Sequence, residues 1–138
     1  MTLLAPPLRQ MLRLNAILRE MHIRRDLAEP DPCPVVKLFS PLGAATWIAT
    51  ELDRDDDTLF GLADLGFGCP ELGSFSLAEL ASVRLPFGLR IERDLAFASP
   101  HRLSVWAVEA RRAGSIIAAE RLLTRAILRG PHPEISSD

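Results

Sequence analysis

The sequence predicts an α+β fold in which a small antiparallel sheet of three to five strands is flanked by helices. From residue 35 to residue 76 the chain is rich in Val, Ile, Thr, Phe and Trp with a period near two, which is typical of strands. Before and after this segment, apolar residues recur at spacings of three and four, which indicates helices. The chain has 138 residues, 48% of them hydrophobic, so we expect one domain over residues 1–138 with a substantial core.

The first helix is predicted over residues 7–24, and two prolines at its start suit the first turn of a helix. One side of this helix is apolar: Leu8, Met11, Leu14, Leu18 and Met21. Another side is polar: Arg9, Arg13, Glu20 and Arg24. We expect the polar side to face water, with a nucleic-acid-binding face as the alternative. A Pro-rich connector completes residues 1–33.

Extended segments that can pair into the sheet are predicted at 35–40, 45–52, 58–65, 71–75 and, as a candidate fifth strand, 91–97. The glycine-rich connection between the third and fourth strands does not match a phosphate-binding loop. Glu71 stands where a dinucleotide-binding fingerprint requires Gly or Ala, and no Gly-Lys-Ser/Thr is present. We therefore predict that Gly66 and Gly68 supply the positive φ angles of a tight turn.

Three helices are predicted after these strands, over residues 77–83, 104–113 and 115–129. The first begins with the capping-box spacing of Ser76 and Glu79. Ser104 is the predicted cap of the second. The C-terminal helical segment occupies residues 115–130, and we expect residues 131–138 to be frayed.

Charge is distributed unevenly along the chain, although the formal net charge is only −2. Residues 1–25 carry +4, residues 26–75 carry −8 and residues 76–138 carry +2. The acidic segment supplies the candidate binding residues, which form a negative surface for a basic partner: Glu51, Asp53, Asp55, Asp56 and Asp57. A solvated turn is the simpler alternative. Calcium is not predicted, because Thr58 stands where a calcium-binding loop requires Gly.

Three residues are candidates for a buried polar network: Asp64, Glu71 and Arg93. Strand alternation places Asp64 on the face of Phe60, Glu71 on the face of Phe75, and Glu51 on the face of Trp47 and Ala49. Such acids either lie at strand ends in water or are partly buried and paired with arginines, because an unpaired buried charge is costly, and we favour a network of arginines and carboxylates. The alternative is a small metal-dependent enzyme in which Glu51, Asp64 and Glu71 converge on a cation.

The sequence lacks the usual signals of other chemistry. Its two cysteines have no CxxC spacing and are expected to be free thiols, and we predict no catalytic residue, metal or cofactor. Because the chain is acidic overall and has no Tyr, we do not expect it to bind nucleic acid. It has neither a signal-peptide pattern nor an apolar run of the roughly 20 residues that cross a bilayer, so we expect a cytoplasmic protein that does not bind membranes.

Residues 34–114 contain four distinctive strings, "VVKLF", "ATWIATELD", "FGLADLGFGCPELGSFSLAEL" and "IERDL". With these strings the segment resembles a family of small bacterial proteins of unknown function that are encoded on conjugative plasmids and integrative elements. The chain departs from the family pattern at Ser74 and at "RLPFGL". No catalytic residues are established for that family.

This resemblance implies a mobile-element setting, in which small proteins frequently bind host machinery and inhibit CRISPR nucleases. We therefore expect a non-enzymatic, protein-binding accessory factor, with an anti-CRISPR-type inhibitor as the specific form. Its partner is expected to be a host or element-encoded protein. The alternatives are the metal-dependent enzyme and a structural protein that forms homo-oligomers.

Overall fold

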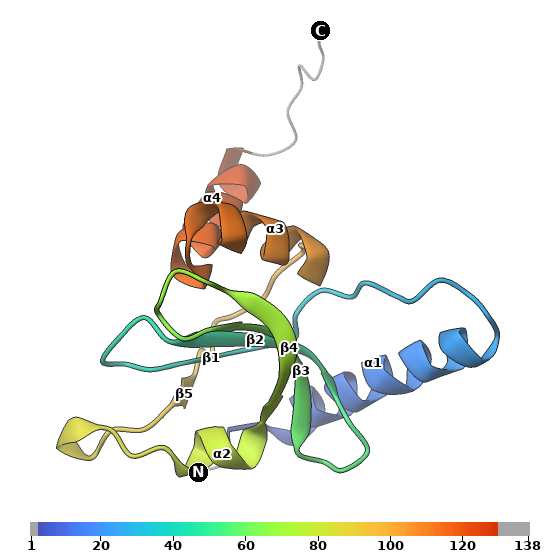
Figure 1. Ribbon diagram of the computed structural model, residues 1–138, viewed down its shortest axis with the longest axis horizontal. Helices are drawn as coiled ribbons and strands as arrows, with labels where there is room; N and C mark the ends of the chain where they lie inside the picture. The colour runs from blue at the N-terminus through green and yellow to red at the C-terminus, as the bar shows by residue number, and fades with distance from the viewer. Residues whose placement is uncertain (1–2, 130–138) are drawn as a thin grey trace, which may run out of the picture.

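The computed structural model describes residues 3–129, which form a sheet covered by helices on both faces (Figure 1). The predicted frayed end, residues 131–138, lies outside the described residues. The helices are α1 (Pro6–Arg24), α2 (Leu77–Ser82), α3 (Leu103–Ala113) and α4 (Ile116–Arg129), with a short 3-10 turn, η1 (Pro86–Gly88). The strands are β1 (Val36–Phe39), β2 (Thr46–Leu52), β3 (Thr58–Asp64), β4 (Glu71–Ser76) and β5 (Glu92–Arg93).

The five strands form one antiparallel sheet in the order β4-β3-β2-β1-β5. This confirms the predicted α+β class. The fifth strand is much shorter than the predicted segment 91–97, because the chain turns at Asp94. The carboxylate of Asp94 accepts a hydrogen bond from the N–H of Ala96, and its carbonyl accepts one from Phe97. The N–H of Asp94 still donates to the carbonyl of Lys37 on β1, and beyond Asp94 the segment leaves the sheet.

Two apolar clusters lie on opposite faces of the sheet. One cluster lies between the sheet and the helices α1 and α2, and it includes Leu12, Trp47 and Leu59. The other cluster lies between the sheet and the helices α3 and α4, and it includes Ile48, Leu62 and Trp106. Figure 1 shows α3 and α4 on one side of the strands and α1 and α2 on the other. Every residue of the central strand β2 is buried, as expected for a strand covered on both faces.

Two capping predictions have different outcomes. The Ser76 hydroxyl accepts a hydrogen bond from the N–H of Glu79, as predicted for the start of α2. The Ser104 prediction is wrong, because the N-cap residue of α3 is Arg102. Ser104 lies inside the helix, and its N–H and hydroxyl both donate to the carboxylate of Asp31 in the Pro-rich connector. The cap is thus supplied from a distant part of the sequence.

The glycines of the β3–β4 connection form a tight turn, as predicted: Gly66 has φ +93° and Gly68 has φ +84°. Gly61 allows close packing of β3 on β2, because a Cβ at this position would lie 1.9 Å from the carbonyl oxygen of Ile48 on β2.

Among residues 3–129 no helix is both long and apolar enough to span a membrane.

Candidate functional site

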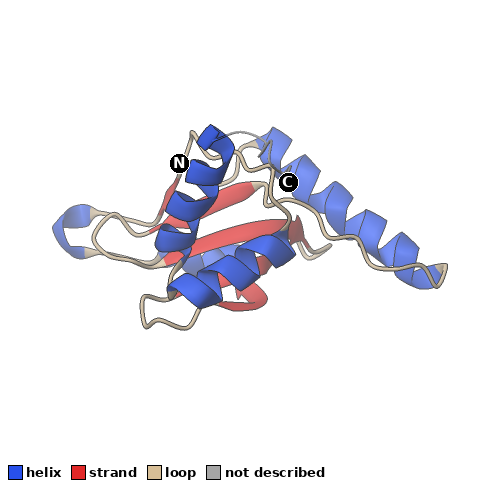
Figure 2. Ribbon diagram, turned by 90° about the horizontal axis from the view of Figure 1, so that it is seen from above, coloured by secondary structure: helices blue, strands red, loops and turns tan. Residues whose placement is uncertain are grey.

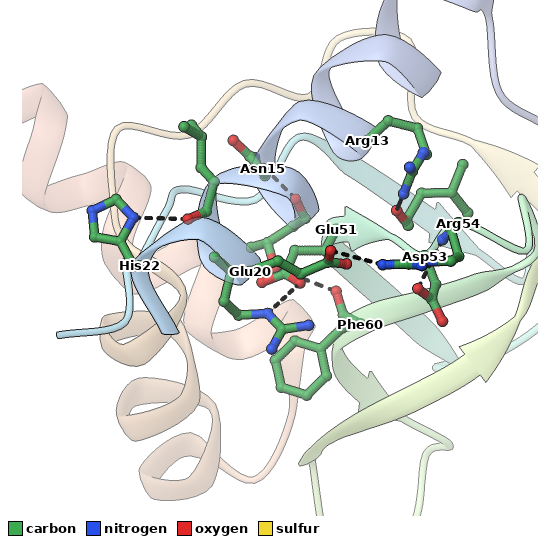
Figure 3. Close-up of polar contacts among 12 residues, drawn as sticks. Arg13, Asn15, Glu20, His22, Glu51, Asp53, Arg54 and Phe60 are labelled. Atoms are coloured by element: carbon green, nitrogen blue, oxygen red, sulfur yellow. Dashed lines mark hydrogen bonds and ion pairs between the residues drawn. The ribbon is translucent and has the colours of Figure 1, made fainter. Parts of the chain in front are cut away.

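Most of the polar side of α1 faces the sheet and the β2–β3 loop, contrary to the prediction that it faces water, while Arg24 is exposed as predicted. The guanidinium of Arg13 donates to the carbonyl of Leu52 at 2.8 Å, and the amide of Asn15 donates to the carbonyl of Thr50 at 2.9 Å. Figure 3 shows Arg13 and Asn15 reaching from α1 toward these acceptors. Since β1 pairs with β2 only as far as Ala49, this part of β2 has no neighbouring strand on that side. The side chains of α1 satisfy backbone groups that β1 leaves free.

Glu51 is bound by the same helix. It is 5% exposed, and one carboxylate oxygen lies 2.7 Å from Nε of Arg19. This hydrogen bond is the main cause that raises the pKa of Arg19 above its usual value. The pair holds α1 against the sheet at the point where β2 extends past β1.

The predicted face of Glu51 is wrong, because β2 contains an irregularity between Ala49 and Glu51. Ala49 is opposite Gly61 and Glu51 is opposite Phe60, so one extra residue, Thr50, is inserted. A bulge of this kind reverses the alternation of the residues that follow it. Glu51 therefore lies with Phe60 beside a cavity of about 160 Å³ that Leu103 of α3 also lines.

The acidic loop between β2 and β3 uses most of its carboxylates internally. Asp57 accepts from the N–H of Ala78 at the start of α2 and from the hydroxyl of Ser76. Asp55 accepts from the N–H and hydroxyl of Thr58, and the hydroxyl contact is the main cause that lowers the pKa of Asp55. Asp53 accepts from the N–H of Arg54. The loop geometry depends on these contacts.

The loop also contacts α1. Asp56 forms an ion pair with Arg9, and Arg54 donates to Glu20 at 3.0 Å, as Figure 3 shows for the second pair. The basic first segment of the sequence and its acidic middle therefore lie side by side, and their opposite charges partly neutralise each other within one molecule.

The three residues of the candidate polar network lie apart. Asp64 is fully buried, and its carboxylate accepts from the backbone N–H groups of Gly66 and Ile116. Glu71 is exposed. Arg93 donates to the carbonyl of Leu3 at 2.8 Å. Backbone N–H groups, rather than an arginine side chain, satisfy the buried acid.

These carboxylates do not converge on one site. Asp64 lies opposite Thr46 across the β2–β3 pair, and Glu51 lies five residues along β2, about 16 Å away at the usual rise of a strand. Within residues 3–129 there is no cluster of three His, Cys, Asp or Glu side chains that could hold a metal ion. A groove of about 760 Å³ lies between Leu3, Ala81 and the segment that contains η1 and β5, and Arg93 is the candidate residue that lines it.

The outward side of α1 is apolar and uncovered. Five large side chains are between 37% and 51% exposed: Met11, Leu14, Ile17, Leu18 and Met21. We call these five residues the α1 stripe. Leu12 and Ala16 are the buried residues of this helix. Figure 2 shows that the far half of α1 extends past the sheet, with the connector running back alongside it.

Periodicity identified four of these residues, together with Leu8, as the apolar side of the helix, but it does not reveal which side faces the sheet. Leu8 alone of that set packs against the core, at the edge of the cluster. The signal that could have revealed the orientation is the short β1, which leaves β2 carbonyls in need of donors. That length is set by pairing between distant segments, so it is not visible within the helix.

The fold and the site define a small α+β protein whose N-terminal helix binds its own sheet through polar side chains and presents an apolar stripe outward. The chain belongs to a family described as proteins of unknown function (DUF2958), whose model matches residues 3–117. The matched region includes all of α1 and ends in the first turn of α4. Comparisons with curated proteins and with solved structures found no significant match.

Proposed function

We propose that this protein is a non-enzymatic accessory factor of a mobile genetic element that acts by binding another protein, and that the α1 stripe is its binding surface. The partner is a host or element-encoded protein. The exposure of five large apolar side chains on one face of one helix is the observation that carries this proposal. Contiguous apolar surface of this kind marks interaction sites on soluble proteins.

The position of α1 supports this role. Polar contacts to Leu52, Thr50 and Glu51 fix the helix on the sheet, so its outward face is already ordered before a partner binds. A rigid surface loses less conformational entropy on association than a flexible one. An amphipathic helix whose apolar side chains are spaced by three and four residues fits an apolar groove or a second helix.

The acidic loop is a weaker candidate than the sequence suggested. Asp55 and Asp57 are used by the turn and by α2, and Asp56 is paired with Arg9. Its remaining charge is suited to the rim of an interface, where charged pairs affect association rate more than affinity. We therefore assign the α1 stripe to the centre of the interface and the loop to its edge.

The test compares capture of partners by the tagged wild type and three variants. L14E/L18E places charge on the stripe, V108E/L122E places the same change on exposed positions of α3 and α4, and D53N/D56N alters the loop. We expect the first variant to lose a partner that the wild type and the second variant retain, with a smaller effect for the third. Equal capture by the wild type and L14E/L18E, confirmed with the purified partner, would reject the proposed surface.

We further propose that the accessory role is inhibition of a host defence system of the CRISPR type, which accords with the mobile-element setting that the sequence resemblance implies. The measurement is survival of a plasmid that a CRISPR nuclease targets. The wild type and V108E/L122E should raise its transformation efficiency, whereas L14E/L18E should not. If protection persists in L14E/L18E, the stripe is not the inhibitory surface.

A further inference from the structure

We propose that the occupant of the α1 stripe is a second copy of the same chain, and that two α1 helices pair in antiparallel fashion about a two-fold axis. This inference rests on the proposed function, because it names the partner of the same surface. A second copy is itself an element-encoded protein, which is one of the two kinds of partner that the proposed function names. Two-fold dimers are also the commonest soluble oligomers.

The spacing of most residues in the stripe places like side chains opposite each other in such a pair. Four of its five residues, Met11, Leu14, Leu18 and Met21, have spacings of three, four and three residues, and the fifth, Ile17, lies next to the centre of this set. The same residue types at the same spacings appear when the helix is read backwards. In an antiparallel pair centred on residue 16, Met11 therefore meets Met21 of the other copy, and Leu14 meets Leu18. Spacings of three and four are those of the apolar seam between paired helices.

The charges beside the stripe agree with this arrangement. Centring the pair on residue 16 places Arg24 of one copy next to Leu8 of the other. There Arg9 binds Asp56, whose side chain is 64% exposed. Arg24 lies on the flank of α1 that faces the acidic loop, because it contacts Glu20, which itself accepts from Arg54. A two-fold axis brings matching flanks together, so the basic end of each helix approaches the acidic loop of the other copy.

The size of the stripe sets the expected affinity. Three helical turns bury less than the roughly 800 Å² per partner of a standard interface. Because α1 is already fixed to the sheet, the helix loses little further conformational entropy when it pairs. We therefore expect a dissociation constant in the micromolar range.

The first test is sedimentation equilibrium of the full chain from low to several hundred micromolar concentration. The wild type and V108E/L122E should form dimers with the same dissociation constant. L14E/L18E should remain monomeric, and its circular dichroism spectrum should show that it is folded. A wild type that stays monomeric over this range would overturn the inference, as would a dimer that L14E/L18E leaves intact.

Orientation is tested by disulfide cross-linking in a background of C33S/C69S. Mixing M11C with M21C should give covalent heterodimers under mild oxidation, whereas M11C alone should give few. Parallel pairing predicts the reverse, with efficient cross-linking of M11C to itself, and that result would reject the antiparallel arrangement. V108C serves as the control for random collision.

The charge contribution is tested with R24A. We expect the dissociation constant to rise about threefold at low salt and the difference from wild type to shrink at high salt, as for exposed ion pairs. An unchanged dissociation constant at low salt would contradict the placement of Arg24 beside the loop of the second copy.

These results separate the inference from the proposed function. If the wild type is monomeric but L14E/L18E loses a different captured protein, the proposed function stands and the second copy is rejected. If the wild type dimerises through the stripe and captures no other protein by it, the inference stands and the proposed host interaction at this surface is rejected.

Discussion

The buried carboxylate of Asp64 accepts a hydrogen bond from the backbone N–H of Ile116 at 2.9 Å, across 52 positions of sequence. This contact joins the end of β3 to the first turn of α4. The first N–H groups of a helix have no partner within the helix, and the positive end of the helix dipole favours a negative charge there. The second oxygen accepts from Gly66 at 2.8 Å, so one side chain also fixes the start of the β3–β4 turn.

Replacing Asp64 is therefore expected to affect two structural elements at once. Asp64→Ala leaves two buried N–H groups without acceptors, and we expect the free energy of unfolding to fall by about 2–4 kcal/mol. Asp64→Asn retains one acceptor and should cost less. Urea unfolding monitored by circular dichroism measures both. Exposed Glu71→Ala, near the other end of the same turn, is the control and should change stability by less than about 0.5 kcal/mol.

The contact between Glu51 and Arg19 should behave as a coupled pair. Arg19→Met leaves a nearly buried carboxylate without its cation, and we expect a loss of about 2 kcal/mol, a value reduced because Arg19 itself is partly exposed. In the double variant with Glu51→Gln, the total loss should be smaller than the sum of the single losses. Denaturant unfolding of all four proteins gives the coupling energy. Additive losses would show that the two side chains act independently.

Asp55 gives a pH-dependent prediction with a defined sign. Because the hydrogen bond from Thr58 lowers the pKa of Asp55 in the folded state, its stabilising effect is present above the unfolded pKa of about 4 and is lost as pH falls through the folded pKa. The stability difference between the wild type and Asp55→Asn should be constant near neutral pH and shrink in acid. Urea unfolding at a series of pH values checks this. A difference that grows as pH falls would contradict the assigned shift.

The sequence predicts the strands and helices well where local signals decide. Alternation of apolar residues locates β1 to β4 within one residue at each end, and the spacing of Ser76 and Glu79 locates the start of α2. These features depend on neighbours close in sequence. The positive φ angles of Gly66 and Gly68 at the β3–β4 turn also depend on residues close in sequence.

The errors occur where distant segments decide. Thr50 is an extra residue in β2, and no local pattern marks the bulge that turns Glu51 to the other face. Asp31, rather than Ser104, caps α3, and this contact spans 73 positions. The sequence predicts the amphipathic pattern of α1, but the orientation of the helix depends on backbone acceptors in β2. For the candidate site, the residue types were therefore predictable and their partners were not.

Gly61 and Gly73 are paired across β3 and β4, which makes them a matched test of close packing. A Cβ at Gly61 would meet backbone atoms of Ile48 and Ala49 at distances of 1.9 to 2.9 Å, whereas a Cβ at Gly73 would meet nothing within 4 Å. Backbone atoms of a buried central strand cannot move aside cheaply, so Gly61→Ala should cost more than about 3 kcal/mol or prevent folding. Gly73→Ala should be neutral or slightly stabilising. Thermal unfolding of the two variants measures the contrast.

Leu12 and Leu14 lie on the same helix and differ in exposure from 0% to 49%, which makes them the clearest test of how α1 is oriented. Leu12 packs in the cluster between α1 and the sheet, so Leu12→Ala should lower the free energy of unfolding by about 2–4 kcal/mol.

Leu14→Ala removes a side chain that is half exposed in the single chain, so its cost should stay below about 0.5 kcal/mol at concentrations where the protein is monomeric. Urea unfolding of dilute protein compares the two variants. Because the substitutions have the same chemistry and the same helix propensity change, a larger loss for Leu14→Ala than for Leu12→Ala would mean that the α1 stripe faces the sheet. If Leu14→Ala becomes destabilising only as protein concentration rises, the α1 stripe is buried by association, since binding to the native state stabilises it by an amount that grows with the concentration of the partner.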